Sequence, residues 1–178
     1  MQAGIHTLLG QGLVLLALTL ASMGAVVGLS AGRNGSAPGL ALSRLLATAF
    51  GACLILANLV MVRALLVRDF TVRYVDQVGS TSVPDWIAVV SLWSALEGSI
   101  LFWGFILGAY TLGFVWATRD RHREFAPYAL GTLMTVGAFF CVLLAGPADP
   151  FGAVVPRPDA AHIGPNPLLQ NKIGRAHV

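Results

Sequence analysis

One acidic residue, Glu97, interrupts the apolar runs of this sequence, and two tryptophans, Trp93 and Trp103, bracket it. On a helix, the two tryptophans would share one stripe with Glu97 beside it, one turn from Trp93. Gly98 and Ser99 are small and lie away from that stripe, where a second helix could approach closely. A carboxylate inside a membrane helix often marks an ion path or a binding site. The stretch 93–103 is therefore the first candidate for chemistry.

A second interpretation of the same residues requires no chemistry. Tryptophan is enriched at membrane–water interfaces, and a carboxylate near a helix end can reach water. The charge-free run 98–117 is about 20 residues long, which is enough to span a bilayer. Glu97 would then lie at the edge of the hydrocarbon, where it needs a partner or water. We expect an ion pair with Arg73 or Arg63, and both interpretations stay open.

The composition identifies the class of protein. The chain is 56% hydrophobic and 11% charged, its mean hydropathy is +0.76, and its net charge is +3. Soluble domains carry about 25% charged residues. These values predict an integral membrane protein and exclude a nucleic-acid-binding surface. The two cysteines lie singly inside apolar runs, so the sequence predicts no metal site.

The apolar runs predict an all-α fold with about four transmembrane helices within residues 1–145. Their expected limits are 8–29, 45–66, 86–117 and 127–144. An extramembrane loop, in which residues 70–74 alternate like a strand, separates the second and third helices. A Pro/Gly-rich extracytoplasmic loop is expected at 146–171. Two G-x-x-x-G steps predict close helix packing, at Gly24 with Gly28 and at Gly104 with Gly108.

The loop arginines predict an orientation. The loops after the first and third helices face one side and carry Arg33, Arg44, Arg119, Arg121 and Arg123. Cytoplasmic loops are enriched in Lys and Arg. We therefore expect these loops in the cytoplasm and the N-terminus, residues 68–85 and the tail outside.

Four stretches together resemble the CcmF/NrfE family of haem lyase subunits from cytochrome c maturation. They are 69–75 (DFTVRYV), 93–103 (WSALEGSILFW), 149–151 (DPF) and 166–170 (NPLLQ). Many members of that family have His before Glu-Gly-Ser, where this chain has Leu96. The family-motif residues carried over are Trp93, Glu97, Gly98, Ser99, Trp103, Asn166, Pro167, Leu168, Leu169 and Gln170.

The resemblance implies a protein of the cell's inner membrane that takes part in covalent attachment of haem to apocytochrome c. It implies a haem chaperone, apocytochrome c and other maturation subunits as partners, and haem as the cofactor of the full-length family. The family's haem-handling parts lie beyond the matched region, so we expect this chain to act as an N-terminal scaffold that binds no haem. Residues 172–178 resemble a non-native tail, with a natural terminus as the alternative. The competing functional hypothesis is an ion- or proton-translocating subunit that uses Glu97.

Overall fold

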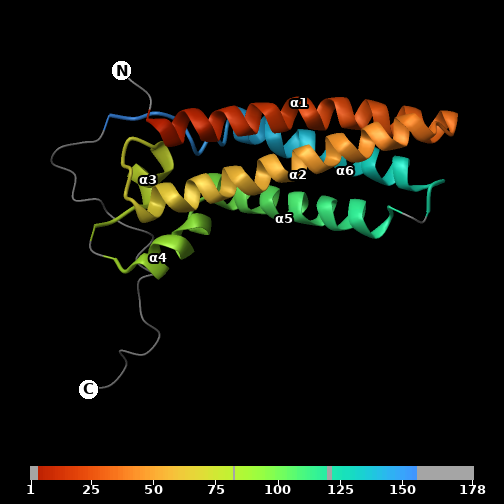
Figure 1. The fold of residues 1–178 in the computed structure, drawn as a ribbon. Coiled ribbons are helices and arrows are strands. Elements are labelled where there is room, and N and C mark those ends of the chain that lie inside the picture. Colours follow the sequence, from red (N-terminus) through yellow and green to blue (C-terminus); the bar gives the residue numbers. More distant parts are fainter. Residues whose placement is uncertain (1–3, 82, 120–121, 156–178) are drawn as a thin grey trace.

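Four long apolar helices form a bundle in the computed structural model, which describes residues 4–81, 83–119 and 122–155 (Figure 1). The helices are α1 (Ile5–Asn34), α2 (Ala37–Leu66), α5 (Leu96–Ala117) and α6 (Ala126–Ala145). Each is long and apolar enough to cross a membrane, which confirms the predicted all-α membrane fold. α1 packs mainly against α2 and α6, and α2 packs against α5.

α1 extends beyond both predicted limits, 8 and 29, whereas α2 begins before the predicted residue 45 and ends at the predicted residue 66. Each contains 30 residues. At 1.5 Å per residue each is about 45 Å long, against about 30 Å of hydrocarbon. The turn between them is short because Gly35 adopts a left-handed conformation, with φ of 58°. Ser36 then caps α2, and its hydroxyl accepts a hydrogen bond from the Gly39 amide at 3.1 Å.

Glycines allow two pairs of helix backbones to touch. A Cβ atom on Gly28 of α1 would lie 2.8 Å from the Cα of Gly131 in α6. A Cβ on Gly108 of α5 would lie 3.1 Å from the carbonyl oxygen of Gly51 in α2. At Gly104 the nearest atoms would be 3.7 Å away, an ordinary contact. The predicted close packing therefore occurs at Gly28 and Gly108.

The third predicted helix, 86–117, is interrupted in the structure. It divides into α4 (Asp85–Val90), a 3-10 turn η1 (Ser91–Trp93), and α5, which begins after Ala95. Ala95 is fully extended, with φ of −135° and ψ of 168°. The two tryptophans of the stretch therefore belong to different elements, and the prediction of one continuous helical stripe is wrong. The interruption arises from contacts with the loop after α2, which local periodicity does not record.

That loop contains one short helix and turns rather than an extended strand. The strand-like alternation at 70–74 appears only as one isolated antiparallel bridge between Val72 and Ala153. The short helix α3 (Arg73–Val78) begins at the next residue. Tyr74 and Phe151 are fully buried and extend the hydrophobic core of the bundle into this loop.

Candidate functional site

Three separate parts of the chain meet at one end of the bundle, which we call the α3 end (Figure 1). They are the loop after α2, the start of α5, and the segment after α6. The Arg73 amide donates to the Gly152 carbonyl at 2.7 Å, and the Val154 amide donates to the Thr71 carbonyl at 3.0 Å. Three of the four stretches singled out in the sequence thus lie together. The fourth, Asn166 to Gln170, is outside the described residues, as is the tail 172–178.

Tyr74 is the centre of this end. Its side chain is fully buried, and its hydroxyl lies 2.8 Å from the carbonyl oxygens of both Ser91 and Leu92. Burial raises the pKa of Tyr74 to about 12, and the nearby Glu97 carboxylate acts in the same direction. The hydroxyl therefore keeps its proton at physiological pH and remains a donor. By binding these carbonyls, it holds the chain in the 3-10 turn that interrupts the predicted helix.

Gly98 provides the space for this arrangement. A Cβ atom there would lie 1.9 Å from the Leu92 carbonyl oxygen and 2.2 Å from the Tyr74 hydroxyl oxygen. Real Cβ atoms essentially never come that close to another heavy atom. Glycine is therefore required at this position for the start of α5 to pack on the loop.

Glu97 lies in the first turn of α5, at the end of the membrane span, and is half-buried. The N-cap residue of α5, Ala95, provides no side-chain hydrogen bond to the free amides of that turn. A carboxylate in the first turn interacts favourably with the positive end of the helix dipole. The structure thus gives Glu97 a structural role at the start of α5.

The predicted partners of Glu97 lie elsewhere. Arg73 is exposed, and its guanidinium packs over Gly152, where an added Cβ would be 3.0 Å from its Cζ atom. Arg63 is exposed in the last turn of α2. Neither of the two ion pairs in the described part of the chain includes Glu97. The structure therefore does not bring together the pair that the sequence suggested.

The aromatic residues of the stretch face outward. Trp93 is 46% exposed and Trp103 is 59% exposed. The ring of Trp93 also contacts Phe102, with 5.5 Å between ring centroids. Ser99 links the two parts of the interrupted helix, because its hydroxyl donates to the Trp93 carbonyl at 3.2 Å. These tryptophans present a surface to lipid or to another protein segment.

Sequence reasoning missed a second polar cluster, at the start of α1. His6 Nδ1 lies 2.6 Å from a carboxylate oxygen of Asp69, and the other oxygen accepts hydrogen bonds from the amide and hydroxyl of Thr71. Burial raises the pKa of Asp69, but hydrogen bonds from Thr71 and His6 outweigh burial and hold this pKa below its ordinary value. The one signal in the sequence was a histidine at the start of an apolar helix. Its partner, Asp69, lies 63 residues away, so no local pattern connects the two.

Asp149 fixes the segment after α6 in a similar way. One of its oxygens accepts from the Phe151 amide and the other from the Gln11 side chain, both at 2.9 Å. The Phe151 ring then fills the space beside Gly10, where an added Cβ would lie 2.1 Å from a ring carbon. The DPF stretch thus forms a tight turn whose aromatic residue is locked against α1.

The described residues do not fit a haem site. Haem iron requires an axial ligand, usually His or Met. His6 is bound to a carboxylate, and His122 lies at the opposite end of the bundle. Met61 and Met134 are fully buried in helix packing, and Met23 is half-exposed on α1. No group of three His, Cys, Asp or Glu side chains able to hold a metal ion occurs in the described part of the chain.

Comparison with known proteins gives a consistent set of relatives. No protein-family profile matches the chain. It is 31% identical to the cytochrome c-type biogenesis protein CcmF of Escherichia coli, over 92% of this chain and 25% of that protein. It is 33% identical to NrfE of Haemophilus influenzae over 59% of this chain and 16% of that protein. The solved structure of a cytochrome c haem lyase CcmF matches with a TM-score of 0.78 and 33% identity, over 88% of this chain and 26% of that one.

Proposed function

Because the chain is homologous to CcmF and NrfE cytochrome c-type biogenesis proteins, and spans about a quarter of the length of the CcmF relatives, we propose that it is a membrane scaffold for covalent haem attachment to apocytochrome c. It resides in the inner membrane with the α3 end extracytoplasmic. Its partners are a haem chaperone, apocytochrome c and other maturation subunits. The scaffold supplies a fixed surface, and residues outside this segment supply the haem ligands.

The observation that supports a scaffold role most directly is the construction of the α3 end. Hydrogen bonds and ring packing join the loop after α2, the start of α5 and the segment after α6 into one buried unit. The outer face of α5 remains open, with Trp103, Tyr110 and Trp116 exposed by 59%, 70% and 73%. Aromatic side chains are favoured at interfaces between proteins and at the membrane surface. This face is available to further helices of a haem lyase.

The scaffold role predicts that the 178-residue chain neither binds haem tightly nor attaches it. The experiment is a haem titration of the detergent-purified chain, followed by its Soret absorption. We expect only nonspecific partitioning, with no saturable low-spin band. A stoichiometric complex that is lost when His6 is replaced by alanine would contradict the proposal.

A chimera tests the function positively. The matching segment of E. coli CcmF is replaced by this chain, and holocytochrome c is measured by haem staining in cells that lack their own CcmF. We expect haem attachment in the chimera and in its Gly113→Ala variant, because an added Cβ at Gly113 meets open space. The Gly98→Ala variant should lose it. Membrane levels of each chimera are measured in parallel, and a well-expressed chimera without activity would refute the proposed role.

The ion-translocating alternative receives no support from the position of Glu97. It is the only acidic residue in the four long helices, and it lies in the first turn of α5. Proton paths use chains of ionisable groups within the membrane. Glu97→Gln in the chimera should therefore retain haem attachment, whereas loss of attachment in a well-folded Glu97→Gln chimera would give the carboxylate a direct role.

A further inference from the structure

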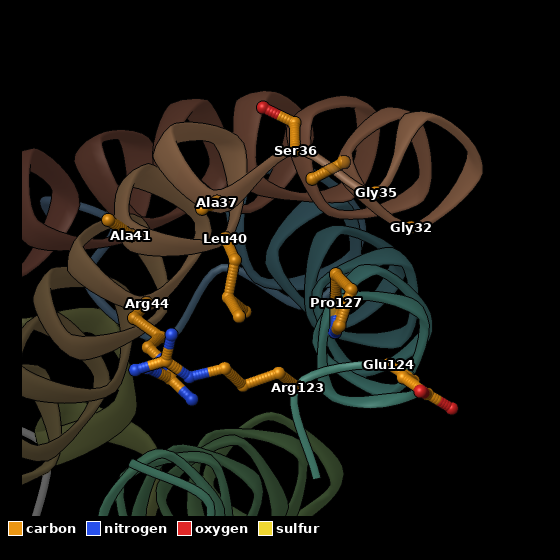
Figure 2. A pocket seen from close by; sticks show the side chains of 11 residues that line it. Gly32, Gly35, Ser36, Ala37, Leu40, Ala41, Arg44, Arg123, Glu124 and Pro127 are labelled. Atoms are coloured by element: carbon orange, nitrogen blue, oxygen red, sulfur yellow. The ribbon is translucent and has the colours of Figure 1, made fainter. Parts of the chain in front are cut away.

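A cavity of about 450 Å³ lies at the opposite end of the bundle from the site described above (Figure 2). It is formed where α1 turns into α2 and where α6 begins. Leu40 and Pro127 give it an apolar wall, and Gly35 and Ser36 line its rim. Two helices, α2 and α6, start beside it, and the positive ends of helix dipoles favour anions.

Arg44 of α2 lines this cavity with an unsatisfied donor. One terminal nitrogen of its guanidinium donates to the Thr118 carbonyl at 2.6 Å, which fixes the side chain in place. Its Nε atom is buried and has no hydrogen-bond partner within the described part of the chain. Buried donors are nearly always paired in folded proteins, so this one requires a water molecule or an anion beside it.

A second cation, Arg123, lines the same cavity. It comes from the loop between α5 and α6, and in Figure 2 its side chain extends toward Arg44, while Glu124 points away from the cavity. Neither arginine belongs to an ion pair among the described residues. Two like charges on one cavity repel each other unless an anion lies between them. Arginine also binds phosphate in a bidentate manner that suits such a bridge.

The depth of the cavity in the membrane favours a lipid as the source of the anion. α2 is about 45 Å long and the hydrocarbon is about 30 Å thick, so about 15 Å of an untilted helix extends beyond the hydrocarbon. Arg44 lies two turns from the start of α2, close to that boundary, from which a long side chain reaches the headgroups.

We propose that this cavity binds a phosphate group through Arg44 and Arg123, and that the group is the phosphodiester of an anionic phospholipid. The proposal does not depend on the function proposed above. It assigns Arg44 as the half-buried contact, held in place by the Thr118 carbonyl, and Arg123 as the exposed contact from the loop before α6.

The test is native mass spectrometry of the 178-residue chain from detergent micelles. Phosphatidylglycerol, phosphatidylcholine or inorganic phosphate is added in separate arms. We expect one retained phosphatidylglycerol in the wild type. Each of Arg44→Gln and Arg123→Gln removes one charge-assisted contact and should weaken retention by at least about tenfold. The matched control is Arg33→Gln, which removes the same charge from an exposed residue outside the cavity.

Each outcome has a defined meaning. Selective retention of phosphatidylglycerol that is lost in the two cavity variants but not in Arg33→Gln supports the proposal. Binding of inorganic phosphate without retention of phosphatidylglycerol would overturn the assignment of the phosphate group to a lipid. Equal losses in Arg33→Gln and Arg123→Gln would reduce the effect to general surface charge and overturn the proposal, as would equal retention of both lipids by the wild type. Because Arg123 is exposed on a loop, its replacement tests the site without disturbing the bundle.

Discussion

Replacing Gly98 with alanine is the most informative single change in this molecule. The added Cβ would fall 1.9 Å from the Leu92 carbonyl oxygen and 2.2 Å from the Tyr74 hydroxyl. Because the Leu92 oxygen is backbone and Tyr74 is fully buried, neither can move freely. The start of α5 must therefore shift away from the loop, and the hydrogen bonds from Tyr74 to the 3-10 turn would be lost.

The expected loss of stability is the balance of two costs and one gain. Overpacking a well-filled core costs about 1–3 kcal/mol. Leaving the buried Tyr74 hydroxyl without its acceptors costs about 1–3 kcal/mol more. Alanine gains about 0.5–1 kcal/mol over glycine within a helix. The packing and hydrogen-bond losses exceed the helix gain, so the free energy of unfolding should fall by about 3 kcal/mol.

The assay is reversible unfolding in mixed micelles with increasing dodecyl sulfate, followed by circular dichroism. Gly113→Ala is the matched control, because it lies in the same helix and its Cβ would meet nothing within 4 Å. That variant should be as stable as the wild type or slightly more stable. Tyr74→Phe already removes the hydrogen bonds that Gly98→Ala would break, and it takes away one of the three close atoms. Tyr74→Phe combined with Gly98→Ala should therefore cost less than the sum of the single changes. Equal stability of Gly98→Ala and Gly113→Ala would refute the packing argument.

Three further predictions concern other parts of the bundle. Gly10→Ala should destabilise the protein by about 2 kcal/mol through its clash with the ring of Phe151, whereas Gly12→Ala, in open space on the same helix, should be neutral in the same assay. The folded-state pKa of Asp69 is lowered, so its ionised form contributes stability above the unfolded pKa of about 3.9, and this contribution disappears as pH falls through the folded pKa. Asp69→Asn should therefore flatten the acid side of the curve of stability against pH. An unchanged acid side would contradict this prediction. A cysteine placed at the exposed position Asn34 should be protected from an impermeant maleimide added outside the cell, whereas one at the exposed position Thr81 should react with it. The reverse pattern would invert the orientation.

The membrane architecture was predictable because it depends on composition. Long charge-free runs can satisfy their backbone groups in lipid only as helices, so four runs predict four spans. The close contacts at Gly28 and Gly108 were likewise visible as small-residue steps. Both ends of α1 and the start of α2 were misjudged, because residues that flank the hydrocarbon can continue a helix without changing its apolar pattern.

The details of the α3 end were not predictable, because they depend on residues distant in sequence. The periodicity of residues 86–103 fits a single helix, and the break appears only through the hydroxyl of Tyr74, which lies 17 and 18 residues before its acceptors. The pair of His6 and Asp69 spans 63 residues and has no local signature. The ion pair suggested for Glu97 was argued from the cost of an unpaired carboxylate near the membrane, and that cost does not determine which loop side chain faces it. In the structure the Arg73 guanidinium packs over Gly152 instead.

The stretch 93–103 can now be explained residue by residue without assigning it chemistry. Glu97 compensates for a poor cap at the start of α5, Gly98 leaves room for Tyr74, and Ser99 ties the new helix to the preceding turn. Together they allow a break in the chain at the membrane boundary, where free backbone groups require partners. The break turns Trp93 and Trp103 outward instead of stacking them along one helix face. On this argument, the stretch builds a rigid aromatic surface beside the start of a candidate membrane span, and such a surface suits contact with lipid or with a second protein segment.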